Sequence, residues 1–146
     1  MKQIYKLIVV CTMIFGVEAF SLDCPKDLTI NFTSPKPNES VNGAKQKVTL
    51  ATNVTGEFFY HLIQSNTSDK KKVNYLQSSG KIESNTFSNY VWLGNETKGK
   101  NSSFVITAII STKEIKKEGK VSIWNEKSLS PKETCKTTSL TISRVD

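Results

Sequence analysis

Apolar and polar residues alternate along most of this chain with a period of two. Leu28, Ile30 and Phe32 alternate with Thr29 and Asn31, and the later runs are rich in β-branched and aromatic residues. A period of two is typical of strands with one buried face, whereas an amphipathic helix repeats about every 3.6 residues. The pattern predicts strands over residues 28–32, 47–54, 57–64, 72–76, 87–93, 103–111, 120–124 and 138–143.

Turn-forming residues separate these runs. Pro, Gly, Asn and Ser recur in the stretches SPKPNES, SNTSDK, SSGK, NETKGKNSS, KKEGK and SLSPKE. Short strands bounded by such turns predict an all-β fold, an immunoglobulin-like antiparallel β-sandwich of about eight strands. Gly119 predicts a hairpin between 103–115 and 120–126, although the residues IKKEG could instead begin a short helix.

The N-terminus has a different pattern from the rest of the chain. The residues MKQIYK are basic, LIVVCTMIFG is apolar, and VEA ends at Ala19 with small residues typical of a cleavage site. The apolar run is shorter than the roughly 20 residues that span a bilayer. We therefore expect a signal peptide over 1–19, one domain over 20–146, no membrane span, and a secreted, extracellular protein.

Removal of residues 1–19 leaves two of the three cysteines, Cys24 and Cys135. A sole pair of cysteines in an oxidising compartment is expected to form a disulfide. A ring of roughly 100 residues stabilises a fold by about 4 to 5 kcal/mol in the loop-entropy model. Two cysteines and one distant histidine do not make a tetrahedral site, so we expect no metal.

The pattern Asn-x-Ser/Thr, which accepts an N-linked glycan in secreted proteins, recurs along the chain. Two copies lie close together in NETKGKNSS, which the predicted strands place at one exposed end of the sandwich. Glycans there would keep that end hydrated and block edge pairing, or would fence off a surface so that binding occurs at the opposite end. The candidate glycosylation sites are Asn31, Asn38, Asn53, Asn66, Asn95 and Asn101.

The sequence has no recognisable set of catalytic residues. Its single histidine, His61, lies within the strand residues FFYHLIQ, where a structural role is favoured over that of a base. The serines lack the context of an activated nucleophile. The acidic residues Glu57, Asp69, Glu83 and Glu114 fall in turns or at strand ends, with no evident carboxylate pair. We therefore predict a binding protein, not an enzyme, with no cofactor.

Lysines gather in two groups within predicted turns. The formal net charge is +7, and it becomes +6 when the signal peptide removes Lys2, Lys6 and Glu18. If the fold brings the two groups together, they would attract sulfated glycans or another anionic surface. Nucleic acid is not an expected partner of a secreted chain without an arginine-rich or base-stacking motif. The two groups are Lys70, Lys71 and Lys72, and Lys113, Lys116, Lys117 and Lys120.

Four segments occur in an order known from one protein family. They are INFTSPKPNESVNGAKQKVTLATN, EFFYHLIQS, NYVWLGNETKGKNSSFVITAIIST and KVSIW, which together span about residues 24–126. In this order they resemble the reeler domain of secreted extracellular-matrix and insect haemolymph defence proteins. The chain lacks that family's interior cysteine between Leu76 and Phe87. The resemblance implies an immunoglobulin-like sandwich that binds in innate defence or matrix contact, without catalytic residues.

Two other kinds of binding protein are compatible with the same sequence. One is a secreted immunomodulatory decoy with an immunoglobulin-like fold that binds a host cytokine or receptor. Its candidate anchors are Phe58, Tyr60, Tyr90 and Trp92. The other is a carbohydrate-binding module, which would present rings such as Trp92 or Trp124 in a flat row. Burial of the tryptophans would disfavour the module, whereas a contiguous exposed aromatic patch would favour a binding face.

Overall fold

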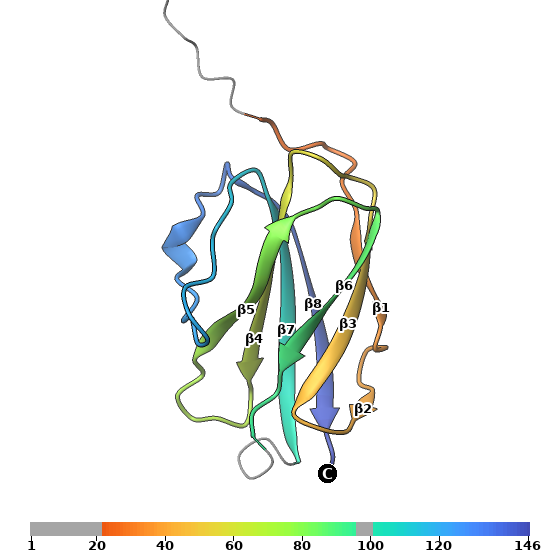
Figure 1. Cartoon of the computed structure of the whole chain (residues 1–146), viewed down its shortest axis with the longest axis vertical. Coiled ribbons are helices and arrows are strands. Elements are labelled where there is room, and N and C mark those ends of the chain that lie inside the picture. Colours follow the sequence, from red (N-terminus) through yellow and green to blue (C-terminus); the bar gives the residue numbers. More distant parts are fainter. Residues whose placement is uncertain (1–21, 96–100) are drawn as a thin grey trace, which may run out of the picture.

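Eight strands and one short helix make up the regular structure of residues 22–95 and 101–146, which the computed structural model describes (Figure 1). The predicted all-β class is confirmed. The predicted signal peptide lies outside the described residues. The strands are β1 (Ile30–Ser34), β2 (Ser40–Val41), β3 (Lys45–Thr52), β4 (Phe59–Asn66), β5 (Asn74–Lys81), β6 (Thr86–Trp92), β7 (Ser102–Ser111) and β8 (Thr134–Arg144), and the 3-10 helix is η1 (Glu126–Ser128).

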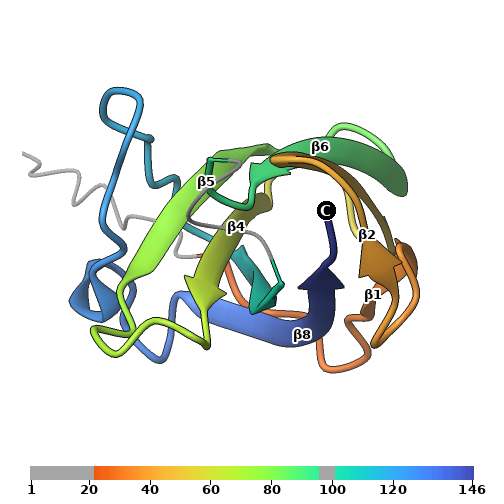
Figure 2. The same cartoon turned by 90° about the horizontal axis from the view of Figure 1, so that it is seen from below.

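The strands form two sheets that face one another, as the end-on view in Figure 2 shows. One sheet has the order β1-β3-β6 and the other the order β2-β8-β7-β4-β5. This is the arrangement of an immunoglobulin sandwich, in which strands A, B and E oppose strands G, F, C and C′. The predicted fold is confirmed, with one difference from a purely antiparallel sandwich: β2 pairs with β8 in parallel.

The core lies between the two inner faces. Alternate residues of each strand point into it, so that Val48 and Leu50 of β3 and Ile106 of β7 are fully buried. Burying one such aliphatic side chain stabilises the fold by about 1.5 to 3 kcal/mol. β5 and β6 belong to different sheets. On their side of the sandwich, the rings of Tyr60 and Phe87 lie 4.7 Å apart and pack against the core.

One predicted strand and one predicted hairpin are wrong. Residues 120–124 do not pair with 103–115, because β7 already has β4 on one side and β8 on the other. Instead, Ile123 forms an isolated bridge with Tyr75 of β5, at the edge of the five-stranded sheet. No helix starts at IKKEG, and Gly119 has a positive φ of 68° in an open turn. The two-residue strand β2 was not predicted, because it is too short to show a period.

The connection between β7 and β8, residues 112–133, is here called the covering segment. It runs beside β5, where Ser79 Oγ donates to the carbonyl of Ile115 and Leu76 N donates to that of Ser122. Figures 1 and 2 show it on the β5 side of the five-stranded sheet, away from β1 and β3. Trp124 then packs on the outer face, with its ring centroid 5.9 Å from that of His61.

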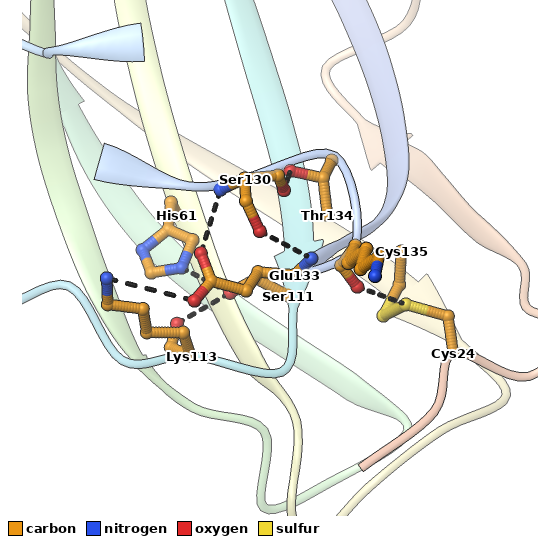
Figure 3. The surroundings of a disulfide bond; sticks show 9 residues. Cys24, His61, Ser111, Lys113, Ser130, Glu133, Thr134 and Cys135 are labelled. Carbon is orange, nitrogen blue, oxygen red and sulfur yellow. Dashed lines mark hydrogen bonds and ion pairs between the residues drawn. A yellow bond between two sulfur atoms is a disulfide. The ribbon is translucent and has the colours of Figure 1, made fainter. Parts of the chain in front are cut away.

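The Sγ atoms of Cys24 and Cys135 lie 2.08 Å apart, which is the length of a disulfide bond. The bond joins the segment before β1 to the start of β8, so it also anchors the end of the covering segment (Figure 3). It lies at the end of the sandwich opposite the C-terminus. The predicted pairing of the two cysteines is therefore present in the structure.

Candidate functional site

The most distinctive surface feature is a pair of aromatic rings on β6. Strand alternation turns Val91 and Leu93 into the core, where both are fully buried. It turns Tyr90 and Trp92 to the opposite face, where they stay 50% and 52% exposed. Two large exposed rings therefore lie two residues apart on one strand face.

Lysines of the neighbouring strand lie beside these rings. In the register of β3 and β6, Lys45 pairs with Trp92 and Lys47 pairs with Tyr90. The Lys45 Nζ lies 4.4 Å from the centroid of the Tyr90 ring, a cation–π contact. Both lysines are exposed, so the end of this face combines aromatic surface with positive charge. The sequence analysis did not single them out, although the alternation in KQKVTL turns both away from the core.

A groove of about 750 Å³ lies next to Trp92, between the edges of β5 and β6. It is the place where the end of β6, the start of β5, the β4–β5 turn and the tip of the covering segment come together. Trp92 and Val121 face it as large exposed apolar side chains, since Val121 is itself 74% exposed. Other lining residues are Gln64, Asn66, Asp69, Tyr75, Gln77, Asn95, Lys117 and Lys120.

Two glutamines connect the sheets at this groove. Gln77 Oε1 accepts a hydrogen bond from the backbone N–H of Trp92 at 2.9 Å, and Gln77 Nε2 lies 3.5 Å from Gln64 Oε1. Gln64 is buried. Three residues before Trp92 on β6, Asn89 Nδ2 donates to the hydroxyls of Tyr60 and Ser78. These bonds hold β5 against β6 and set the position from which the Trp92 side chain leaves the backbone.

The structure brings together some of the predicted lysines and separates others. Lys117 and Lys120 line the groove, and Asp69, which begins the turn of Lys70, Lys71 and Lys72, lines it too. Lys113 lies elsewhere, 3.9 Å from a Glu133 carboxylate oxygen and donating to the carbonyl of Ser128. Lys116 is exposed and does not line the groove.

The predicted aromatic anchors also divide into two groups. Phe58 is buried in the core, and Tyr60 packs inward against Phe87. Trp124 is half-buried on the opposite side of the molecule from β3, against His61. Of the predicted aromatic anchors, Tyr90 and Trp92 are therefore the two whose rings are exposed to a ligand.

His61 and Ser111 form a buried pair beneath the covering segment (Figure 3). Ser111 Oγ donates to the carbonyl of Lys113, so it accepts the His61 Nε2 proton at 2.7 Å. Burial lowers the pKa of His61 to about 4, against a smaller opposing effect of the Lys113 carbonyl. Neither side chain is exposed, and the serine proton is already engaged. The sequence favoured a strand histidine with a satisfied partner; Nε2 has such a partner in Ser111, whereas Nδ1 is buried without one among the described residues.

A second hollow, of about 720 Å³, lies beside the disulfide and includes Glu57, Lys113 and Glu133 among its lining residues. Ser130 N donates to Glu133 Oε2 at 2.7 Å, which lowers the pKa of Glu133. The predicted turn acids Glu57, Asp69, Glu83 and Glu114 are all exposed. Across the described residues, no three His, Cys, Asp or Glu side chains are grouped so that they could hold a metal ion.

The candidate glycosylation sites lie mostly at the surface. Asn31, Asn38, Asn53, Asn95 and Asn101 are exposed, and Asn66 is half-exposed at the end of β4. Asn31 points away from the core, as predicted. β6 ends at Trp92 and β7 begins at Ser102 at the end of the sandwich that holds the C-terminus (Figure 1), and residues 96–100 of NETKGKNSS lie outside the described residues.

The chain matches no protein-family model and no curated protein. The resemblance to the reeler domain therefore stays a prediction. Within the described residues, no helix is both long and apolar enough to cross a bilayer.

Proposed function

We propose that this protein is a secreted glycoprotein that acts by binding an extracellular ligand at Trp92, Tyr90 and the adjoining groove. The observation that carries the proposal is the half-exposure of both rings on a strand face whose other outward positions, Thr86 and Ser88, are polar. Exposed tryptophan and tyrosine are enriched where proteins bind partners, since they offer large contact area with few rotatable bonds.

Several sequence features support an extracellular setting for this binding. They are the signal-peptide pattern of residues 1–19, a cysteine pair at disulfide distance, and repeated glycosylation signals at exposed positions. The reeler resemblance suggests innate defence or matrix contact as the biological setting. An immunomodulatory decoy would use the same two rings.

A carbohydrate-binding module is the second candidate, favoured by the row of Tyr90 and Trp92 on one strand face. A sugar ring presents C–H bonds that pack on the negative face of an aromatic ring. Trp124 does not extend this row, because it packs against His61. In this proposal, the sugar therefore packs on the rings of Tyr90 and Trp92 and on no other ring.

The proposal is tested by capturing partners from extracellular fluid with the secreted protein and with the double variant Tyr90→Ser, Trp92→Ser. Loss of two interface aromatic anchors is expected to weaken binding by at least about tenfold. The control is Thr86→Ala, Ser88→Ala, on the same face of the same strand. Equal capture by the wild type and the Tyr90/Trp92 variant would place binding elsewhere.

The glycosylation part of the proposal has its own measurement. We expect at least three of the Asn-x-Ser/Thr sites to carry glycans in protein secreted from eukaryotic cells. Treatment with an enzyme that removes N-glycans should then lower the mass in steps that map to individual asparagines. An unchanged mass would refute glycosylation and leave the binding groove as a separate question.

A further inference from the structure

We infer that the groove beside Trp92 takes a sulfated oligosaccharide, with a sugar ring on the tryptophan and sulfate groups held by lysines on the surrounding segments. The inference rests on the proposed function, and it names the class of ligand. Its grounds are the distribution of charge around the groove, the absence of internal neutralisation, and the shape and chemistry of the lining.

Positive charge reaches this end of the sandwich from three separate parts of the chain. Lys45 and Lys47 come from β3, Lys117 and Lys120 from the covering segment, and 70–72 from the β4–β5 turn. Since these segments are far apart in sequence, only the fold gathers their charges. The lysine groups noticed in the sequence account for part of this set, and β3 adds the rest.

These lysines are not neutralised within the molecule. Among the described residues, ion pairs join Lys113 to Glu133 and Arg144 to Asp146, and none involves the lysines around the groove. Asp69 is the one carboxylate among the described lining residues, and its Oδ1 accepts the backbone N–H of Lys71, which shapes the turn. A polyanion would therefore meet several ammonium groups that form no ion pair among the described residues, with that of Lys45 lying over the Tyr90 ring, and one engaged carboxylate.

The groove itself favours a sugar over other anionic partners. Trp92 supplies a flat apolar face, and the amide side chains of Gln64 and Asn66 line the groove beside it. Hydroxyl and sulfate groups match such a mixture of aromatic, amide and ammonium groups. A flat anionic membrane would contact exposed lysines but could not fill a concave groove beside a tryptophan.

Each exposed lysine contributes little by itself. A surface ion pair in salt water is weak, so binding depends on several lysines acting at once. The affinity should consequently fall steeply as ionic strength rises. Removing two groove lysines is expected to cost roughly tenfold in affinity.

The test uses the secreted, disulfide-bonded protein carrying Trp124→Phe. The chain has two tryptophans, so Trp92 is then the sole source of tryptophan fluorescence. Titration with a sulfated heparin oligosaccharide should give a saturable fluorescence change, and an unsulfated oligosaccharide of equal length should bind at least about tenfold more weakly. Retention on immobilised heparin should persist well above about 0.15 M salt.

Lys117→Ser, Lys120→Ser should weaken oligosaccharide binding about tenfold. The matched control, Lys127→Ser, Lys132→Ser, removes the same charge from the same covering segment away from the groove, and should change affinity less than about twofold. Equal losses in both variants, or elution at or below about 0.15 M salt, would overturn the inference.

Two further outcomes would also overturn it. Binding to vesicles of anionic phospholipid without binding to the heparin oligosaccharide would assign the lysines to a membrane surface. Fluorescence that responds to the oligosaccharide only after N-glycans are removed would assign the groove to the protein's own sugars at Asn66 or Asn95, both of which line it. In either case, partner capture that depends on Tyr90 and Trp92 would leave the proposed function standing.

Discussion

The outer faces of the two sheets differ in what lies on them. On the five-stranded sheet, Ile63 and Ile109 point outward beneath the covering segment, together with the buried His61. On the three-stranded sheet, none of the described segments covers the outer face of β6, and Tyr90 and Trp92 remain half-exposed. Each face thus has one tryptophan, but Trp124 is used for packing inside the molecule, while Trp92 has a surface available for a ligand.

This difference separates structural from functional aromatic residues. Trp124 N donates to the carbonyl of Asn74, and its ring contacts His61, so internal contacts explain its place. The backbone N–H of Trp92 donates to Gln77 Oε1, and Trp92 pairs with Lys45 in the β3 register. An exposed tryptophan that the fold does not need is a stronger sign of binding than a buried one.

The largest expected effect tests what holds the covered face in place. Replacing both Cys24 and Cys135 by Ser opens a ring whose ends are 111 residues apart, which should lower the free energy of unfolding by about 4 to 5 kcal/mol. The measurement is denaturant unfolding of the variant and of the wild type with and without reductant. Two free thiols in the unreduced wild type, or an unchanged midpoint, would contradict the role assigned to the bond.

Acid should destabilise the covered face through His61. Its pKa is lowered from 6.5 to about 4, so between these pH values the unfolded chain binds more protons than the folded one. The stabilisation is complete above pH 6.5 and is lost as the pH falls to about 4, by about 3 kcal/mol in total.

His61→Gln is the control for this measurement, because an amide N–H can still donate to Ser111 Oγ and the side chain does not titrate. Unfolding free energies of both proteins are measured from pH 7 to pH 4. The wild type should lose about 3 kcal/mol more than the variant. Parallel curves would show that the pKa of His61 is the same in the folded and the unfolded chain, and would contradict this prediction.

The smallest expected effect on stability comes from comparing the two tryptophans, one on each outer face of the sandwich. Trp124→Ala should cost about 2 kcal/mol, less than a fully buried tryptophan because the ring is half-exposed. Trp92→Ala should change stability by about 0.5 kcal/mol or less and yet abolish ligand binding. Thermal unfolding of both variants, compared with binding of the captured ligand, checks the pair. A large loss of stability in Trp92→Ala would make that ring structural.

Much of the sandwich could be predicted from local pattern. Period-two alternation located all the longer strands, because side chains that alternate along a strand must meet core and solvent in turn. The observed strand bounds differ from the predicted ones by a few residues. For example, β5 begins at Asn74 and continues to Lys81, whereas the predicted strand is 72–76. The disulfide was predicted because removal of the signal peptide leaves Cys24 and Cys135 as the one pair of cysteines in an oxidising compartment.

The candidate site was only partly predictable. Trp92, Lys117 and Lys120 were noticed as residues, but the groove that they share was not. Gln77 gave no signal, because a glutamine in a strand is ordinary until Trp92 N is found bonded to it. Lys45 and Lys47 could have been identified from their outward positions next to β6, had the strand pairing been known.

The sequence by itself determined the class of fold, the inward side of strands with clear alternation such as β3, and the pair of cysteines that meet. Only the tertiary structure decided that 112–133 would lie along β5, and therefore that Trp124 would be covered and Trp92 left open. The two tryptophans have similar neighbours along the chain. Alternation specifies which way a side chain points, whereas what lies against it depends on contacts between distant segments, which no local pattern records.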